Sequence, residues 1–393
     1  MTAPPRPDAA PLTGLKIIDL SHFISGPFAT MLLGDLGAEV IKVEPPGGDP
    51  TRLIPPFISE GNSTFYYSVN RNKRGIVLDL KSDPGKAALR DLLADADVVV
   101  HNFRAGVIER LGFDFTTLHA LNPKLVMCAV CGFDSVGPYG ELPATDSLVQ
   151  AISGVMSITG DPDGPPARVG YQIGDTAGAL FASVAILAGL QARNRDGTGR
   201  YVEVSILDAQ LSLLVWQAQD YFTHDIVYSR VGTRLANMPP SRAYQCSDGR
   251  FVYATPSALP RWWSGYVNAL GRPDLLDDPR FRTIDDRRRH VVELERIIED
   301  AFAKHDSDHW VTAFQRMGVP VALVQTIDEA FAFPTVARRE MIVEVENADG
   351  TRQRMVGNPI KAGGPASFTA PPTLGQHTDE VLAELAARRA AAG

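Results

Sequence analysis

The chain has 393 residues, of which 45% are hydrophobic and 21% charged, and its formal net charge is -8. This length exceeds the roughly 100–200 residues of an average domain, so we expect two domains with a large buried core. No block of lysine or arginine supplies the basic surface that nucleic acid or an anionic membrane requires. We therefore expect a small-molecule partner, with no nucleic acid and no membrane.

The N-terminal stretch MTAPPRPDAAPL has no apolar segment typical of a secretory signal. The longest apolar run, residues 177–190, is shorter than the ~20 residues of a membrane span. Three cysteines are too few for a disulfide framework, which favours a reducing compartment. These features predict a soluble, cytoplasmic protein.

Strands and helices alternate along the first 200 residues. Apolar, β-branched runs predict six strands, at 15–21, 38–44, 75–80, 97–103, 124–133 and 200–206. Helical patterns lie between them, including those at 26–38 and 83–96. This alternation predicts an α/β fold: a Rossmann-like, mostly parallel sheet with helices on both faces. Ligands of such sheets bind at the carboxyl ends of the strands.

The pattern changes near residue 225. One long helix is predicted at 207–225, and it ends the first part of a large domain, 1–225. A turn-rich stretch, a hairpin and several helices then predict a smaller α+β domain at 226–325. Residues 326–393 contain a strand-like piece, a proline-rich stretch and a last helix at 378–391.

Common catalytic motifs are missing from the sequence. There is no G-x-G-x-x-G after the first strand, no P-loop, no G-x-S-x-G and no H-E-x-x-H. Cys128 and Cys131 form a C-x-x-C, but positions three apart in a strand point to opposite faces, so we interpret them as packing thiols. We expect no metal site.

Residues 170–187, GYQIGDTAGALFASVAIL, place one carboxylate, Asp175, before a long run of small and apolar residues. One interpretation is that Asp175 caps a helix that begins at Thr176. The other is that Gly174 and Gly178 leave the carboxylate open to a bulky electrophile, which it attacks as a nucleophile. With its ordinary pKa of ~3.9, the group would be ionised at pH 7 and would need no base. The residues alone leave both interpretations open.

Six blocks follow one another nearly from end to end of the chain: LKIIDLSHFISGPFATMLLGDLGAEVIKVEPPGGDPTR, NRNKRGIVLDLKSDPGK, ADVVVHNFRAGVIERLGF, LNPKLVMCAVCGFDSVGPYG, IGDTAGALFASVAILAGLQARNRDGTGRYVEVSILDA, and VGNPIKAGG with LGQHTDEVL. In this order they resemble the class III CoA-transferase family, which includes formyl-CoA transferase and carnitine CoA-transferase. The resemblance implies transfer of CoA from an acyl-CoA donor to a carboxylic acid, with Asp175 as the catalytic residue. Asp175 would form a mixed anhydride, then an aspartyl-CoA thioester, then a second anhydride with the acceptor. We expect backbone N–H groups at the helix start beside Asp175 to stabilise the oxyanions.

The resemblance also implies the residues that contact CoA, which here is a substrate rather than a tightly bound cofactor. Carried over by position, these are Ile24, Ser25, Leu78, Asp79, Leu80, Lys81, Asn102, Phe103, Arg104 and Arg110. The three cations could meet phosphate oxygens, and Phe103 could pack on adenine. Each has a plain structural alternative, as a surface charge or a core side chain.

Two rival functions remain open. An acyl-CoA racemase of the same superfamily carries an A-G-H-D motif, where this chain has PATDS with Thr145 in place of the histidine. Threonine cannot accept a proton at neutral pH, which favours the transferase. The second rival is a non-catalytic CoA-binding protein in which Asp175 only caps a helix.

Some positions depart from the formyl-CoA transferase pattern. Ile24 replaces a glutamine, Pro45 an arginine and Cys131 a lysine, and the run of four glycines has no counterpart near residues 236–246. These differences argue against formate or oxalate as co-substrate and against flap closure. A larger or less polar acyl group would suit Phe23 and Ile24, and the donor and acceptor stay unidentified.

The resemblance implies a homodimer as well. In the family, two chains interlock like links, and each large domain is built from both ends of its chain with the small domain inserted between them. Residues 326–393 would then complete the large domain begun by 1–225.

Overall fold

A computed structural model describes residues 10–59, 62–256, 259–364 and 367–392. The chain divides into two compact units. The first unit comprises Met1–Val155, Val169–Ile226 and Thr335–Gly393, and the second comprises Met156–Arg168 and Val227–Pro334. The second unit thus reaches beyond the expected range 226–325 and includes a segment, Met156–Arg168, that the expected range leaves out.

A six-stranded parallel sheet forms the centre of the first unit. Its strands, in spatial order, are β5 (Lys73–Val77), β2 (Glu39–Glu44), β1 (Lys16–Asp19), β6 (Val98–His101), β7 (Val126–Cys131) and β8 (Tyr201–Ser205). The strand order reverses between β1 and β6, and a crevice at such a switch point is where open α/β sheets bind ligands. The predicted α/β class and the parallel sheet are confirmed.

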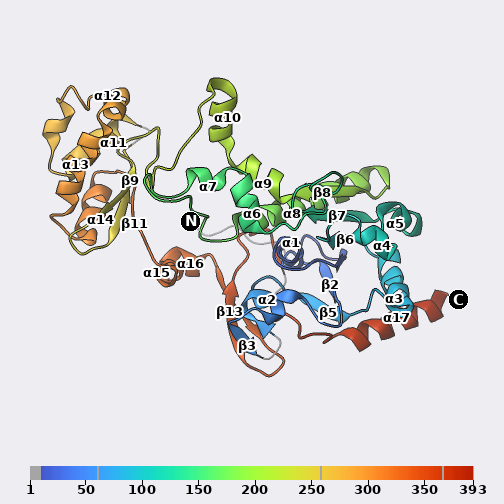
Figure 1. Cartoon of the computed structure of the whole chain (residues 1–393). Coiled ribbons are helices and arrows are strands. Elements are labelled where there is room, and N and C mark those ends of the chain that lie inside the picture. The colour runs from blue at the N-terminus through green and yellow to red at the C-terminus, as the bar shows by residue number, and fades with distance from the viewer. Residues whose placement is uncertain (1–9, 60–61, 257–258, 365–366, 393) are drawn as a thin grey trace. The chain divides into compact units, whose positions relative to one another are not determined.

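Apolar side chains leave both faces of this sheet, as expected for buried parallel strands. In β6, Val98 and Val100 pack with α1 (Ser25–Gly34) and α8 (Ile173–Asp196). Val99 points to the other face, where it joins the core formed with α3 (Asp83–Ala94) and α17 (Thr378–Ala392). Figure 1 shows α8 along β7 and β8, and α17 beside α3.

The remaining elements of the first unit are short. They are η1 (Pro50–Leu53), β3 (Phe57–Ser59), β4 (Asn62–Ser63), α2 (Thr64–Ser68), α4 (Val107–Leu111), α5 (Phe115–Leu121), α6 (Asp146–Ile152), α9 (Ile206–Leu213), α10 (Val215–His224), β12 (Ile342–Glu346) and β13 (Arg352–Val356), with α7 (Val155–Ile158) and α16 (Pro334–Arg338) at the boundaries between the units. The prediction of one helix at 207–225 was wrong, because Val215 adopts a φ of 38° and separates α9 from α10. Within the described residues α8 alone is long and apolar enough to span a membrane by composition, a property that core helices share.

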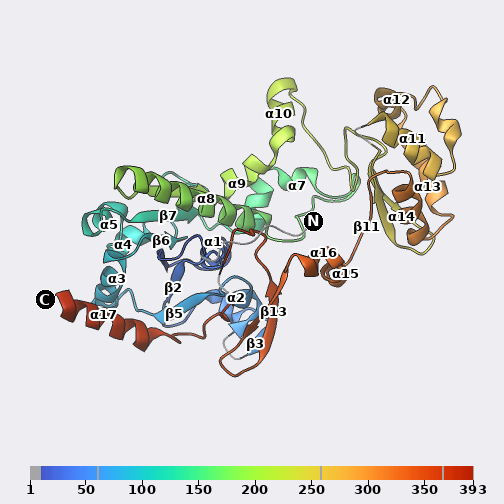
Figure 2. The ribbon, with the colours of Figure 1, turned by 180° about the vertical axis from the view of Figure 1, so that it is seen from behind.

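The C-terminal segment covers the β5 edge of the sheet. The N–H of Gly75 donates to His377 Nδ1 at 3.0 Å, and that of Val77 donates to Thr378 Oγ1 at 3.0 Å. These bonds satisfy edge-strand groups that would otherwise offer a template for pairing. Figures 1 and 2 both show β13 beside β3, where the hairpin β12–β13 packs on Tyr67.

The second unit has its own core. Its antiparallel sheet has the order β11 (Val321–Leu323), β10 (Phe251–Ala254), β9 (Arg242–Gln245). Its helical elements are α11 (Pro260–Ala269), η2 (Pro273–Leu276), α12 (Ile284–Arg289), α13 (Val291–Phe302), α14 (Ser307–Arg316) and α15 (Ile327–Ala332). Aromatic side chains dominate this core, with Tyr244, Phe302 and Phe314 in contact.

Candidate active site

Asp175 lies in the first turn of α8 and lines a cavity of about 380 Å³. The cavity opens at the switch point, against the segments that follow β1, β6 and β7. Its lining consists of Phe23, Ile24, Ser25, Phe65, Asn102, Phe103, Arg104, Val130, Cys131, Gly132, Phe133, Gly140, Leu142, Ala144, Thr145, Asp146, Ser147, Gln172, Asp175 and Ile206. The walls combine apolar and polar side chains, and Arg104 is the one lysine or arginine among these residues.

The structure gathers only part of the residues expected to contact CoA. Those that share the cavity with Asp175 are Ile24, Ser25, Asn102, Phe103 and Arg104. Leu78 and Asp79 line a different cavity, of about 450 Å³, between α3 and α17. Leu80, Lys81 and Arg110 line neither cavity, and Lys81 and Arg110 are exposed.

Asp175 does not cap its helix. The helix begins at Ile173, two residues after Tyr171, rather than at Thr176. The carboxylate of Asp146, at the start of α6, accepts from the N–H of Gly174 at 2.7 Å and from the N–H of Asp175 at 3.2 Å. The capping interpretation of Asp175 was therefore wrong, because another acid, 29 residues earlier, performs that role for α8.

Asp146 belongs to a buried polar network that the sequence analysis missed. Gln150 is fully buried, donates from Nε2 to Asp146 Oδ2 at 2.5 Å and accepts from the N–H of Val169 at 2.9 Å. Gln210, also fully buried, accepts from Ser153 Oγ at 2.9 Å. The i, i+4 spacing of Asp146 and Gln150 was a signal of one such pair, but nothing local indicated that the pair reaches α8.

Gly174 serves close packing rather than access. A Cβ atom there would lie 2.1 Å from Gln210 Nε2, 2.9 Å from Ile206 Cγ2 and 3.0 Å from Asp146 Oδ1. A Cβ at Gly178 would lie 3.3 Å from Ile206 Cγ1. The expectation that these glycines clear space around the Asp175 carboxylate was wrong, because they let α8 approach α9 and the network below it.

The Asp175 carboxylate has no hydrogen bond or ion pair within the part of the chain that the structure describes. Burial, and then the neighbouring charge of Asp146, raise the pKa of Asp175 to about 7. The raised pKa argues against the expectation that the carboxyl group keeps its ordinary pKa of ~3.9. A carboxylate with so little stabilisation is a stronger nucleophile than a solvated one.

The loop after β1 forms one wall of the cavity, and hydrogen bonds from Asn102 and Lys42 fix its backbone. Asn102 accepts from the N–H of His22 at 2.8 Å and donates to its carbonyl oxygen at 2.7 Å. Lys42 Nζ donates to the carbonyl of Ser21 at 2.7 Å. Phe23, which is 47% exposed, adopts a φ of 64°, a left-handed conformation that costs a non-glycine residue energy. The amide of Asn102 is thus already occupied by the loop.

The N-termini of α8 and α1 lie at this cavity, and they differ in whether their first N–H groups have hydrogen-bond acceptors. The first N–H groups of α8 donate to Asp146. In α1, Ile24 provides no side-chain cap, and the N–H groups of Ser25 and Gly26 have no acceptor within the described residues. The expectation that the start of α8 supplies oxyanion donors was therefore wrong, and the free donors belong to α1.

The cysteines do not form a reactive pair. Cys128 is buried in the core, whereas Cys131 borders the cavity. Burial raises the pKa of both thiols to about 12, which suppresses the reactive thiolate. Within the described residues no cluster of histidine, cysteine, aspartate or glutamate could hold a metal ion.

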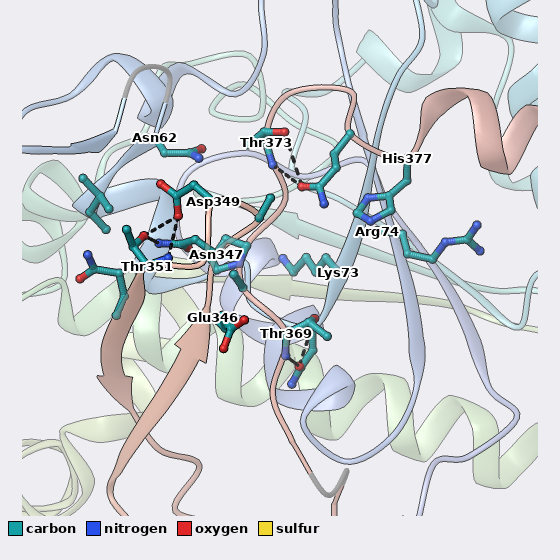
Figure 3. A pocket seen from close by; sticks show the side chains of 17 residues that line it. Asn62, Lys73, Arg74, Glu346, Asn347, Asp349, Thr351, Thr369, Thr373 and His377 are labelled. Atoms are coloured by element: carbon teal, nitrogen blue, oxygen red, sulfur yellow. Dashed lines mark hydrogen bonds between the residues drawn. The ribbon is translucent and has the colours of Figure 1, made fainter.

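A larger cavity, of about 600 Å³, lies beside the hairpin β12–β13 (Figure 3). Its charged groups are already paired. Arg74 contacts three glutamates, Lys73 contacts Asp19, and Asp349 accepts from Thr351. None of the residues expected in the site lines this cavity, so its size alone gives it no chemical role.

Comparison with known proteins agrees with the geometry. The model of CoA-transferase family III matches residues 12–378. The chain is 37% identical to acetyl-CoA:oxalate CoA-transferase of Acetobacter aceti, over 92% of each chain. It is 36% identical to succinate–glutarate CoA-transferase of Agrobacterium fabrum, over 95% of this chain and 96% of the relative. It is 35% identical to succinyl-CoA–D-citramalate CoA-transferase of Chloroflexus aurantiacus, over 97% and 94%.

Solved structures are similar as well. A CaiB/BaiF family protein from Brucella suis superposes with a TM-score of 0.85 at 31% identity, covering 96% of this chain and all of its own. A Mycobacterium tuberculosis protein superposes with a TM-score of 0.84 at 30% identity, over 95% and 99%. The chain belongs to CoA-transferase family III and is a CoA-transferase that acts between acyl-CoA and carboxylic acids.

Proposed function

We propose that the enzyme transfers CoA through covalent intermediates on Asp175. The observation that carries this proposal is a carboxylate that lines an open cavity at the switch point and has no cation or hydrogen-bond donor on it among the residues that the structure describes. Structural carboxylates in such surroundings are normally paired. An unpaired one, whose pKa burial and Asp146 raise, fits a nucleophile.

Four acyl transfers complete the reaction. Asp175 attacks the thioester carbonyl of the donor, the C–S bond breaks, and a mixed anhydride and CoA thiolate result. The thiolate attacks the Asp175 acyl carbon of the anhydride, which releases the donor acid and leaves an aspartyl-CoA thioester. The acceptor carboxylate displaces the thiolate again and forms a second anhydride. The thiolate then attacks the acceptor's acyl carbon, which gives the new acyl-CoA and restores the Asp175 carboxylate.

Each step develops an oxyanion, and the lining supplies donors for it. The N–H group of Ser25, a lining residue at the start of α1, is free within the described residues, and helix N-termini favour negative charge. The hydroxyls of Thr145 and Ser147 line the same cavity. We assign these groups, in place of the start of α8, to oxyanion stabilisation.

CoA enters from the side of Phe103 and Arg104, which share the cavity with Asp175. Arg104 suits a phosphate and Phe103 suits the adenine ring or the pantetheine arm. The expected contacts at Leu78–Lys81 and at Arg110 stay predictions, since these residues lie outside this cavity. Asn102 contributes by fixing the loop that contains Phe23 and Ile24.

The racemase alternative loses support at the cavity. Thr145 occupies the place of its histidine, and no histidine is among the lining residues. A racemase needs a second acid–base group across from the aspartate to deliver a proton to the opposite face of the α-carbon. The relatives named above include enzymes whose names specify succinate or succinyl-CoA, so we propose succinyl-CoA as a donor and a small carboxylic acid as acceptor.

We propose a cytoplasmic homodimer, as expected above. An exposed apolar surface supports the dimer, and it is formed by α8 and α6 residues Leu148, Ile152, Leu180, Phe181, Val184 and Leu187. Exposed apolar side chains on two helices in this way suit an interface between subunits. Three free cysteines agree with a reducing compartment.

Intact-mass spectrometry after brief incubation with succinyl-CoA, followed by peptide mapping, tests the mechanism. We expect a CoA-sized or succinyl-sized increment on the Asp175 peptide, and we expect turnover to fall by at least about 10³-fold in Asp175→Asn, which cannot form an anhydride. Asp208→Asn, an acid in the first turn of α9, is the matched control and should keep the adduct. CoA binding without any adduct, across several donors, would contradict the proposal and favour a racemase or a binding protein.

A further inference from the structure

The start of α8 contains an arrangement that ordinary capping does not require. Helices are usually capped by a residue adjacent in sequence, whereas α8 is capped by Asp146 from another helix, and Gln172 at the N-cap position makes no side-chain bond. The cap is itself an acid, and it lies next to the nucleophile in the chain fold. Placing two acids together in a poorly solvated site is costly, so the arrangement needs a reason other than stability.

Asp146 is fixed in place by its surroundings. It is 5% exposed, and both of its oxygens are occupied, Oδ1 by the two N–H groups of α8 and Oδ2 by Gln150. Gln150 is held in turn by the N–H of Val169. The network leaves Asp146 no freedom to turn away from α8.

Asp175 would be stabilised if Asp146 were absent. An acid in the first turn of a helix normally gains from the free N–H groups and the positive end of the helix dipole. Asp146 occupies the N–H groups of Gly174 and Asp175 and cancels that end of the dipole. The other ionisable side chains that line the cavity are Arg104 and Cys131, and neither contacts the Asp175 carboxylate within the described residues.

We propose that Asp146 is a positioning residue for the nucleophile: it holds the first turn of α8 so that Asp175 faces the cavity, and it withdraws from Asp175 the helix-end stabilisation that would weaken its attack. The inference rests on the proposed function for its catalytic meaning. The electrostatic effect of Asp146 on Asp175 can be measured without any turnover.

The test labels carboxyl groups with a water-soluble carbodiimide and glycine ethyl ester, which modify the protonated form, and follows the Asp175 peptide by mass spectrometry from about pH 5 to about pH 8.5. In the unaltered enzyme, half-labelling should fall near pH 7. In Asp146→Asn, which keeps an acceptor oxygen for the α8 N–H groups, the midpoint should fall by at least about one pH unit. Asp146→Glu keeps the carboxyl group and should stay within about 0.3 pH unit of the unaltered enzyme.

An unchanged midpoint in Asp146→Asn would overturn the proposal, because a purely structural residue lowers stability without moving this midpoint. Asp146→Ser, also neutral, replaces Asp146→Asn if circular dichroism shows that the latter does not fold. Asp208→Asn should leave the midpoint where it is.

Adduct formation with succinyl-CoA at pH 8 should slow by about tenfold in Asp146→Asn. If the midpoint falls in Asp146→Asn as expected but the unaltered enzyme forms no adduct, the proposed function alone is rejected. If the unaltered enzyme forms the adduct but the midpoint does not move in Asp146→Asn, the role of Asp146 alone is rejected.

Discussion

Asp19 and Asp175 are two aspartates of the same unit, and their surroundings differ in every respect that matters for a carboxylate. Asp19 ends β1, is fully buried and accepts from Lys73 Nζ at 2.9 Å, from Thr30 Oγ1 at 2.7 Å and from the N–H and hydroxyl of Ser21. Burial alone would raise the pKa of Asp19, but Lys73 and Lys42 outweigh it and hold the pKa well below its usual value. Asp175 has no such partner in the described part of the chain, and its pKa is raised to about 7.

The difference separates a carboxylate that stabilises the fold from one that is available for chemistry. The Asp19 cluster, through Lys42 and Ser21, fixes the loop that forms a wall of the cavity. The Asp175 carboxylate lacks such stabilising partners, and its position depends on the rigid packing of the elements around it. Four substitutions test this contrast.

Lys73→Met should have the largest effect on stability. It removes the cation nearest to a fully buried carboxylate, and breaking a buried pair in this way lowers the free energy of unfolding by about 3–5 kcal/mol. Urea unfolding measures the loss. The neighbouring Arg74→Met is the control, since Arg74 pairs with glutamates that are 41–59% exposed and should cost about 1 kcal/mol. Equal losses in both variants would contradict the contrast.

Gly174→Ala should lower the free energy of unfolding by about 2–3 kcal/mol, because its Cβ would collide with Gln210 and Ile206. Gly170→Ala, four residues earlier in a position where a Cβ meets nothing within 4 Å, should change stability by less than about 0.5 kcal/mol. Thermal unfolding of both variants checks the expectation. If Gly174→Ala folded as stably as Gly170→Ala, the frame around Asp175 would be looser than the structure indicates.

Asp175→Asn should stabilise the enzyme at pH 8 while it abolishes turnover. The folded-state pKa of about 7 lies above the ordinary 3.8, so the folded state binds its proton more tightly than the unfolded chain. Stability from this group is therefore complete below about pH 4 and declines as the pH rises to about 7. Asparagine does not titrate, and the variant should gain about 1–3 kcal/mol at pH 8 relative to the unaltered enzyme, a figure reduced for partial exposure.

Unfolding of both proteins at about pH 4.5 and about pH 8 measures this gain. The advantage of Asp175→Asn should grow with pH. A constant difference between the two proteins would mean that Asp175 is ionised in the folded enzyme throughout, as a solvated carboxylate would be.

Phe23→Gly should have the smallest effect on stability, within about 1 kcal/mol. Glycine relieves the left-handed φ of 64° but adds freedom to the unfolded chain, and these terms nearly cancel. The variant removes a cavity wall, so the KM for acyl-CoA should rise while the protein stays folded. Steady-state kinetics with melting as the control measures both, and a large loss of stability would show that Phe23 belongs to the core instead.

Local patterns predicted much of the large unit. The runs around Ile17, Val99 and Met127 read as buried strands, and each forms a strand of the parallel sheet. Asp175 could be singled out because it is a lone acid between a glycine and an apolar segment. The break at Val215 could not be predicted, since the apolar pattern continues across it while the backbone leaves the helical conformation.

The sequence by itself determined the alternating elements, which follow from hydrophobic periodicity, and it contains the six blocks by which the chain resembles its family. It also singled out Asp175 as a candidate, because this acid stands alone between a glycine and an apolar run. Only the tertiary structure decided the state of that acid. Asp146 lies 28 positions before Gly174, and Gln210 lies 36 positions after it. The hydrogen bonds of Asp146 and the packing of Gln210 at the start of α8 exist only after the helices dock. The pKa of Asp175, the need for Gly174 and the choice of α1 over α8 for free N–H groups all follow from those contacts, since burial and hydrogen bonding are properties of the packed chain.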